Sequence, residues 1–318
     1  MKKIVLGNTG LETAPIVFGG NVFGWTLNKK ESFKILDEFV DLGFNMIDTA
    51  DVYSRWNDGN VGGESENIIG DWLKQSGKRD KVILATKAGM DMGDGKNISH
   101  DYILKAAENS LKRLQTEYVD VYFTHTDVEG SPIEETLAAH NTLVKEGKVK
   151  NIGASNMSPE RLKQSIELSK QNGWPAYEIF QPEYNLYDHE AYDEKYADLV
   201  NEYNLAVVSY YSLASGFLSG KYRNESDLNK SVRGSGIKKY LNEKGQHILT
   251  ALDEVAEAHN TTQAAVSLAW LIAQPNVTPI ASATKSSHLK AFREAAELEL
   301  TSEEVVKLTN ASQEVEMH

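Results

Sequence analysis

Short apolar runs alternate with amphipathic stretches along most of the chain. The apolar runs have the length of buried strands and occupy residues 16–18, 44–48, 82–87, 119–125, 151–155, 179–181, 206–210 and 278–281. The stretches between and after them repeat their apolar positions with the period of a helix, at residues 30–42, 64–75, 101–114, 133–146, 159–172, 190–203, 242–259 and 287–296. This alternation is typical of repeated β-α units that share a parallel sheet.

Further segments lie outside the repeat. Residues 3–6 and 15–17 flank an Asn-Thr-Gly turn at 8–10, which predicts a β-hairpin ahead of the main fold. Residues 262–274 and 302–312 have a helical pattern but no strand of their own. We therefore expect two extra helices in addition to the repeated units.

Both a closed barrel and an open doubly wound sheet contain repeated β-α units. A dinucleotide-binding doubly wound fold carries the pattern G-x-G-x-x-G after its first strand. Here the nearest glycine pair, Gly19-Gly20, leads into Asn21-Val22 instead. Polar residues also stand at the ends of many strands, as they do in a barrel, and are not gathered at one crevice. The sequence therefore predicts one domain, residues 1–318, built as a (β/α)8 TIM barrel.

Polar and ionisable residues stand where the predicted strands end. In chain order they are Asp48 and Tyr53, Lys87, His125, Ser155 and Asn156, Gln181, Tyr210, and finally Ser282, Thr284 and Lys285. The carboxyl ends of barrel strands meet at one mouth, so we expect these side chains to surround a single pocket.

Four of these side chains suit the reduction of a carbonyl group. Hydride transfer to a carbonyl leaves an alkoxide, which must receive a proton as it forms. We expect Tyr53 to donate that proton, helped by the Lys87 ammonium, which favours the phenolate and makes the phenol a better acid. Asp48 would hold Lys87 in its charged form, and His125 would donate a hydrogen bond to the developing oxyanion.

Several segments resemble the motifs of the aldo-keto reductase family. They are residues 44–53 (FNMIDTADVY), 63–66 (GESE), 82–87 (VILATK), 120–125 (DVYFTH), 147–156 (GKVKNIGASN) and 180–185 (FQPEYN). The motifs follow one another in family order, and the resemblance runs from about Leu6 to Thr301. It implies an enzyme that uses NADPH/NADP+ to reduce aldehydes or ketones to alcohols without a metal.

The resemblance also implies a role for each residue at a family position. Asp48, Tyr53, Lys87 and His125 match the catalytic tetrad; Ser155, Asn156 and Gln181 match the residues that hydrogen-bond the nicotinamide carboxamide; Leu213, Ser215 and Gly216 match the pyrophosphate loop. Tyr210 matches the aromatic residue that stacks on the nicotinamide ring, which implies transfer of the pro-R hydride. Lys285 matches the cation at the adenosine 2′-phosphate, with Ser282 and Thr284 as candidate phosphate donors.

A few positions depart from the family pattern. Ser282 replaces a common glycine, and Ala291-Phe292 stand where many members carry Glu-Asn against adenine. The second departure leaves the strength of the preference for NADP over NAD open. Tyr210 competes with its neighbour Tyr211 for the stacking position, and its spacing to the pyrophosphate loop favours Tyr210.

Loops beyond the strands are expected to determine the substrate. Trp25 and Trp56 follow the first and second strands, where they would line a substrate pocket or pack in the core or at its rim. Residues 216–240 form a long polar segment after the seventh strand, which predicts a surface loop near the site.

Composition narrows the class of protein. The chain has no cysteine and a formal net charge of −13, which excludes disulfides and thiolate metal sites and argues against non-specific nucleic-acid binding. No apolar run approaches the roughly 20 residues that span a bilayer, and none near the N-terminus resembles a signal peptide. We expect a cytoplasmic enzyme whose partner is a small carbonyl compound; the oligomeric state stays open.

Two other functions remain as alternatives. One is an NADPH-binding regulatory barrel with little turnover, like the channel-associated relatives of this fold. The absence of an extended segment before the barrel argues against it. The other is a metal-dependent barrel isomerase or hydrolase that uses Asp48, Asp51, His125 and Asp127 as ligands. No carboxylate pair follows the later strands, so we expect no metal.

Overall fold

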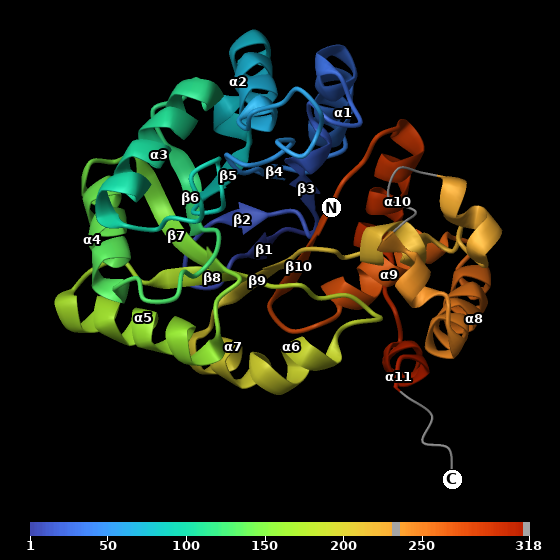
Figure 1. The fold of residues 1–318 in the computed structure, drawn as a ribbon. Helices are drawn as coiled ribbons and strands as arrows, with labels where there is room; N and C mark the ends of the chain where they lie inside the picture. The colour runs from blue at the N-terminus through green and yellow to red at the C-terminus, as the bar shows by residue number, and fades with distance from the viewer. Residues whose placement is uncertain (231–235, 314–318) are drawn as a thin grey trace.

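The computed structural model describes residues 1–230 and 236–313, and in them eight parallel strands close into a barrel. The strand order is β10-β3-β4-β5-β6-β7-β8-β9, so each strand pairs with the next along the chain and the last pairs with the first (Figure 1). The strands are β3 (Val17–Gly19), β4 (Met46–Asp48), β5 (Ile83–Ala88), β6 (Val119–Thr124), β7 (Val149–Ser155), β8 (Tyr177–Gln181), β9 (Ala206–Ser209) and β10 (Val277–Ala281). The predicted (β/α)8 barrel is confirmed.

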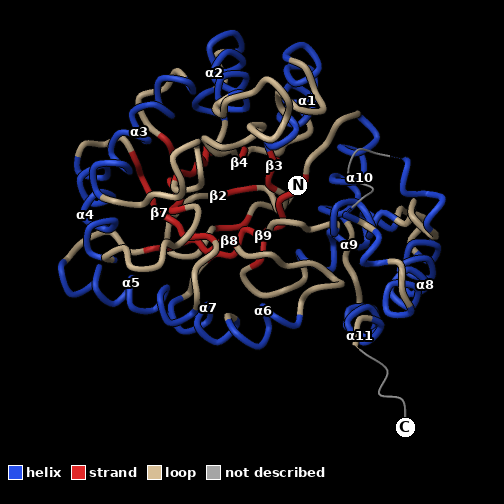
Figure 2. Tube along the Cα trace, in the orientation of Figure 1, coloured by secondary structure: helices blue, strands red, loops and turns tan. Residues whose placement is uncertain are grey.

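Helices surround the strands on the outside (Figure 2). They are α1 (Lys29–Asp41), α2 (Glu64–Ser76), α3 (His100–Leu114), α4 (Ile133–Lys145), α5 (Pro159–Asn172), α6 (Glu190–Lys195), α7 (Ala197–Tyr203), α8 (Glu243–Ala258), α9 (Gln263–Ile272), α10 (Ser286–Glu297) and α11 (Ser302–Ala311). Capping residues mark where some of these helices begin and end. Asn28 and Glu31 form a capping box at the start of α1, and Gly173 ends α5 in a left-handed conformation.

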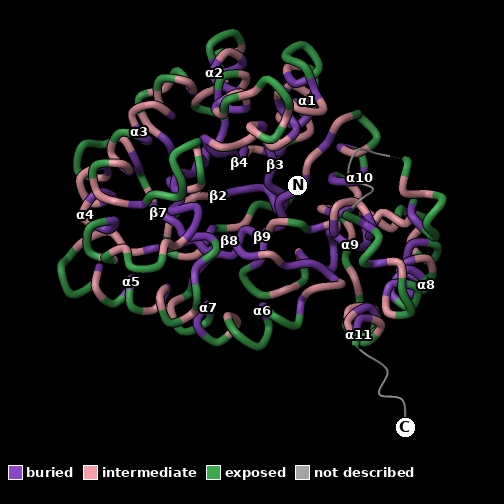
Figure 3. The backbone as a smooth tube through the Cα atoms, in the orientation of Figure 1, coloured by how far each residue is buried: buried purple, intermediate pink, exposed green. Residues whose placement is uncertain are grey.

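The barrel has an inner and an outer apolar layer. The inner layer includes Val17, Met46, Val121 and Ile179, and these side chains fill the barrel interior. The outer layer lies between the strands and the helices, and Figure 3 shows the strand region buried beneath a more exposed helical ring. Because both faces of each strand are covered, the strands read as nearly continuous apolar runs.

The N-terminal hairpin closes one end of the barrel, but its second strand differs from the prediction. β1 (Ile4–Val5) pairs with β2 (Glu12–Thr13), not with residues 15–17. Val17 instead begins the first barrel strand, because its side chain belongs to the inner barrel core. Leu6 of the hairpin is buried in that same core, so the hairpin plugs the end where the strands begin.

Among the described residues, two helices lie outside the barrel layer, and one of them is not the predicted one. α9 packs against β10 and α10 and therefore occupies the barrel layer, although residues 262–274 were expected to be an addition. α8 packs on α9 and on α11, so α8 and α11 are the extra pair (Figure 1). The position of α9 in the barrel layer agrees with its burial. Seven of its ten residues, from Ala265 to Leu271, are buried, as is typical of a helix enclosed on several sides.

Two further segments differ in detail from the sequence prediction. The helix expected at 190–203 is divided at Tyr196, whose ring packs against Phe180 and whose hydroxyl donates to the main-chain oxygen of Met157. The segment 216–240 contains short 3-10 turns, among them Glu225–Lys230, and residues 231–235 lie outside the described part. None of the described helices is long and apolar enough to cross a membrane.

Candidate active site

Asp48, Tyr53 and Lys87 meet at the mouth of the barrel. Lys87 Nζ donates to Asp48 Oδ2 at 2.6 Å and to the Tyr53 hydroxyl at 3.0 Å, and a third hydrogen bond reaches the main-chain oxygen of Thr49 at 2.7 Å. An ammonium has three donors, and all three are used here. The Lys87 side chain is fully buried, so these bonds fix its position.

Burial dominates the acid–base properties of this group. It raises the pKa of Tyr53 well above 10, and the nearby Asp48 carboxylate raises it further. Burial also lowers the pKa of Lys87, against the opposing charge of Asp48. The Lys87 ammonium, which donates to the Tyr53 hydroxyl, favours the phenolate, but the net shift of the Tyr53 pKa is upward, with burial as its largest cause. Tyr53 remains a protonated phenol at neutral pH.

His125 faces the same mouth and is neutral. Its ring centroid lies 6.1 Å from that of Tyr53, and its Nδ1 is buried with no hydrogen-bond partner among the described residues. Burial, together with the charges of Lys87 and Lys96, holds the pKa of His125 well below its usual range. A neutral imidazole keeps one N–H donor and one acceptor. The site therefore offers the phenol of Tyr53 and the ring of His125 side by side.

The residues predicted to hold a nicotinamide carboxamide lie next to this group and are linked to it. Gln181 Nε2 donates to Asp48 Oδ1 at 3.1 Å, which sequence reasoning did not foresee. Asn156 Nδ2 donates to the main-chain oxygen of His125 at 3.0 Å, and Asn156 Oδ1 accepts from the Tyr210 hydroxyl at 2.9 Å. Ser155 Oγ donates to the main-chain oxygen of Gln181. These bonds fix the amide side chains in place.

Tyr210 and Tyr211 have different surroundings. Tyr210 is partly buried, whereas Tyr211 is 56% exposed and has a left-handed backbone. Their rings meet edge to face at 5.2 Å. The bond between Tyr210 and Asn156 places Tyr210, not Tyr211, beside the predicted carboxamide residues.

The predicted pyrophosphate loop is a tight turn after β9. Leu213 precedes it, and Ser215 and Gly216 have φ angles of 58° and 100°. The second value lies where residues with a Cβ are rarely found, which explains the glycine. The Lys221 side chain lies beside Gly216, and this cation was not singled out from the sequence.

The predicted phosphate-binding residues follow β10. Lys285 is exposed and stands immediately before α10, and it forms no ion pair within the described part of the chain. Thr284 is partly buried, and its main-chain N–H donates to His288 Nδ1. Ser282 Oγ instead lies 2.8 Å from the Gly19 oxygen and 2.6 Å from Asn21 Oδ1. In this structure the Ser282 hydroxyl therefore ties β10 to the end of β3.

Two tryptophans form a wall beside Tyr53. The Trp25 and Trp56 rings meet edge to face at 5.5 Å, and Trp56 lies 6.1 Å from the Tyr53 ring. Trp56 is 49% exposed, which leaves much of its surface open to a ligand. Core packing, one of the alternatives for Trp56, is therefore wrong.

The described residues, 1–230 and 236–313, contain no group of three or more His, Asp or Glu side chains that could hold a metal ion. Asp51 and Asp48, two of the ligands considered from the sequence, lie in different surroundings. Asp48 is bonded to Lys87 and Gln181, whereas Asp51 Oδ1 is buried without a hydrogen-bond partner in the described structure.

Known proteins resemble this chain over most of its length. The model of the Aldo/keto reductase family matches residues 15–313. An aldo-keto reductase of Strobilurus tenacellus is 31% identical over 301 residues, which cover 93% of this chain and 85% of the relative. L-glyceraldehyde 3-phosphate reductase of Escherichia coli (strain K12) is 31% identical over 286 residues, 86% of this chain and 81% of the relative. A probable voltage-gated potassium channel subunit beta of Arabidopsis thaliana is 28% identical over 305 residues, covering 92% and 90%. The chain belongs to the aldo/keto reductase family.

Proposed function

We propose that this family member is an NADP(H)-dependent reductase of aldehydes or ketones, built as one domain, with Tyr53 as the proton donor. One observation carries the proposal: Lys87 Nζ lies 3.0 Å from the Tyr53 hydroxyl while it is bonded to Asp48 at 2.6 Å. This arrangement supplies a protonated phenol with a fixed positive charge next to its oxygen. When bound, the nicotinamide cofactor would supply the hydride.

Tyr53 donates its proton to the oxygen that hydride addition leaves on the substrate. Its raised pKa keeps the phenol protonated, and an alkoxide is a much stronger base, so the transfer remains favourable. Lys87 stabilises the phenolate that forms, because its ammonium already donates a hydrogen bond to that oxygen. Asp48 keeps the ammonium in place through the bond at 2.6 Å.

His125 orients the substrate carbonyl. Its low pKa keeps the ring neutral, so it donates a hydrogen bond without competing with Tyr53 as an acid. The substrate oxygen would then accept bonds from His125 and Tyr53 together, and the exposed face of Trp56 would contact the rest of the molecule. Trp25, which meets Trp56 edge to face, completes that wall.

The residues around the mouth fit a phosphorylated dinucleotide. Asn156 and Gln181 offer amide groups whose positions are fixed, and Tyr210 offers a ring beside them. The left-handed turn at Ser215 and Gly216 and the nearby Lys221 suit a pyrophosphate. Lys285, exposed at the start of α10, suits a 2′-phosphate, because a helix N-terminus favours negative charge.

The proposal is tested by NADPH consumption with the purified chain across a panel of aldehydes and ketones, compared with NADH. Turnover with NADPH on at least one carbonyl compound is the expected result. The second candidate function is a regulatory barrel, favoured by the Arabidopsis relative, which is named as a potassium channel subunit. NADPH binding without turnover on any member of the panel would support that function instead.

A further inference from the structure

Asp51 joins the end of a barrel strand to the start of a helix. Its main-chain N–H donates to the Lys87 oxygen at 3.1 Å, and its carbonyl accepts from the Gly63 N–H at 2.6 Å. Gly63 is the N-cap of α2, and Lys87 lies near the carboxyl end of β5. The main chain of Asp51 therefore fixes the strand end from which the Lys87 side chain extends.

The Asp51 carboxyl group is buried and incompletely bonded. The residue is 2% exposed, and its Oδ1 has no hydrogen-bond partner in the described structure. An ionised carboxylate in such a place is unfavourable unless positive charge lies near it. Burial, and then the charge of Glu66, raises the pKa of Asp51 to about 7, whereas Arg113 and Lys87 oppose that rise.

The charged groups around Asp51 come from several elements. Glu66 on α2 is fully buried. Its carboxylate accepts one hydrogen bond of 2.6 Å from Arg113 Nε, on α3, and another of 2.6 Å from the Thr86 hydroxyl, on β5. Arg113 is thus already paired with Glu66. The Lys87 ammonium is the other cation that favours the ionised form of Asp51.

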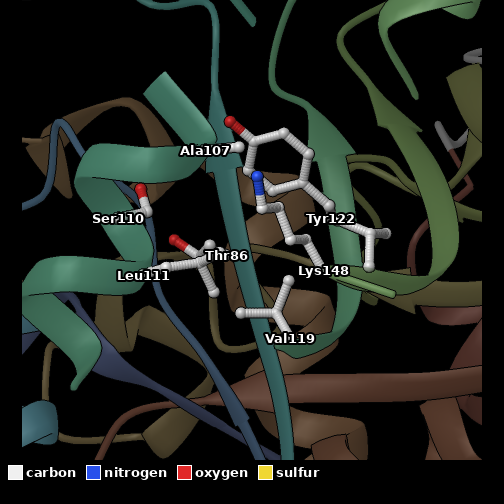
Figure 4. A pocket seen from close by; sticks show the side chains of 8 residues that line it. Thr86, Ala107, Ser110, Leu111, Val119, Tyr122 and Lys148 are labelled. Atoms are coloured by element: carbon white, nitrogen blue, oxygen red, sulfur yellow. The ribbon is translucent and has the colours of Figure 1, made fainter. Parts of the chain in front are cut away.

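Two tyrosines also lie in these surroundings, Tyr122 on β6 and Tyr102 on α3. Burial raises the pKa of both hydroxyls, and the charge of Asp51 raises it further. The Tyr122 side chain and Thr86 line the seam between α3 and strands β5 and β6 (Figure 4). This seam lies under α3 and is separate from the mouth that holds Tyr53. The Asp51 carboxyl group therefore interacts through its charge with Lys87 of the catalytic group and with the buried pair of Glu66 and Arg113.

We propose that Asp51 is a positioning residue for Lys87: its main chain fixes the end of β5, and its buried carboxylate keeps the Lys87 ammonium charged on the alkaline side of neutrality. Burial alone lowers the pKa of Lys87, and Asp48, Asp51 and Glu66 raise it, in that order. Asp51 differs from Asp48 because it does not touch Lys87 Nζ and acts through its charge. The inference rests on the proposed function, since it assigns Lys87 a role in turnover.

The test is the pH profile of kcat for aldehyde reduction at saturating NADPH. Asp51→Asn preserves the size of the side chain and both main-chain bonds but removes the negative charge. We expect the alkaline limb of kcat to shift to lower pH by about one unit, so that kcat above both midpoints falls up to about tenfold. Below about pH 6 the two proteins should converge, because Asp51 is protonated in the wild type there. The Kd for NADPH should stay unchanged.

Two variants serve as controls. Asp51→Glu restores a carboxyl and should recover much of the alkaline limb, whereas Asp41→Asn, at a side chain that is 74% exposed, should leave the profile unchanged. An unchanged alkaline midpoint in Asp51→Asn, or a kcat lowered equally at every pH, would overturn the proposal. If Asp51→Asn does not fold, Asp51→Ser removes the same charge with a smaller group, and the same shift is expected.

A wild-type chain without turnover would refute the proposed function but would still test Asp51. Nitrogen-15 NMR of the lysine side chains, with Lys87 assigned by its absence in Lys87→Met, then gives the titration midpoint directly. A lower midpoint in Asp51→Asn than in the wild type supports the inference. Equal midpoints contradict it.

Discussion

Gln181 Nε2 lies 3.1 Å from Asp48 Oδ1, although the two residues are 133 positions apart in the chain. The other carboxylate oxygen of Asp48 accepts a hydrogen bond of 2.6 Å from Lys87 Nζ, so both oxygens of the carboxylate are bonded. Because β8 ends at Gln181 and β4 at Asp48, the bond crosses the mouth of the barrel. Gln181 thereby connects the proposed cofactor residues to the proton-donating group.

Replacement of Gln181 by methionine should lower kcat while the chain stays folded. The change leaves Asp48 Oδ1 buried without its donor, and a hydrogen bond to a charged group contributes about 1.5–3 kcal/mol. We expect kcat to fall by about tenfold or more, measured with saturating NADPH and aldehyde. Gln115→Met is the matched control, since Gln115 donates to the exposed Asp71 in the same way. Equal kcat in both variants would show that the bond to Asp48 has no role in turnover.

Tyr53→Phe should abolish most turnover without loss of cofactor binding. It removes only the hydroxyl, and general acid catalysis typically contributes about 10²–10⁴-fold. We expect kcat to fall by at least that factor, with the Kd for NADPH nearly unchanged, measured by fluorescence titration. Lys87→Met should be nearly inactive as well, because no charge then stabilises the phenolate.

The control for Tyr53 is Tyr203→Phe, which removes a surface hydroxyl that donates to Glu167. It should retain wild-type kcat. Near-wild-type turnover of Tyr53→Phe would mean that another group donates the proton, and the assigned roles of Lys87 and Asp48 would no longer hold.

Lys285→Ala should weaken NADPH binding selectively. A charge-assisted contact contributes about 1.5–3 kcal/mol, which corresponds to a loss of roughly ten- to a hundredfold in Kd. NADH has no 2′-phosphate, so its Kd should stay nearly unchanged. Lys290→Ala, an exposed lysine of the same helix, is the control and should affect neither cofactor. Equal losses for NADPH and NADH in Lys285→Ala would contradict the assignment.

His140 should make the fold sensitive to acid. Burial lowers its pKa to about 3, so the folded chain keeps the ring neutral where the unfolded chain takes up a proton. The unfolded state therefore binds more protons between pH 6.5 and 3, and stability falls as pH decreases through that range by up to about 1.4 kcal/mol per pH unit. Above pH 6.5 this contribution is constant.

The test compares urea unfolding of the wild type and His140→Asn between pH 5 and pH 8. The wild-type advantage in unfolding free energy should shrink by about 2 kcal/mol from pH 6.5 to pH 5. Other titrating groups are common to both proteins and cancel in the difference. A difference that is constant with pH would show that His140 does not cause the acid sensitivity.

Much of the fold could be predicted from chain order and periodicity. The apolar runs gave the strand positions, and parallel strands joined by helices bring their carboxyl ends to one side. Asp48, Tyr53, Lys87 and His125 were therefore expected at one mouth, where the structure has them. Both properties follow from local sequence and from the direction of the chain, so no contact between distant residues has to be known.

Tertiary packing decided the rest. A helical pattern does not state how many neighbours a helix has, so only the packed structure shows that α9 lies in the barrel layer and α8 outside it. Nor does a motif reveal desolvation: the raised pKa of Tyr53 depends on how completely the fold removes water from it. The bond of Gln181 to Asp48 and the burial of Asp51 arise where separate elements meet. Such through-space contacts depend on the closed barrel, because no single β-α unit contains both partners.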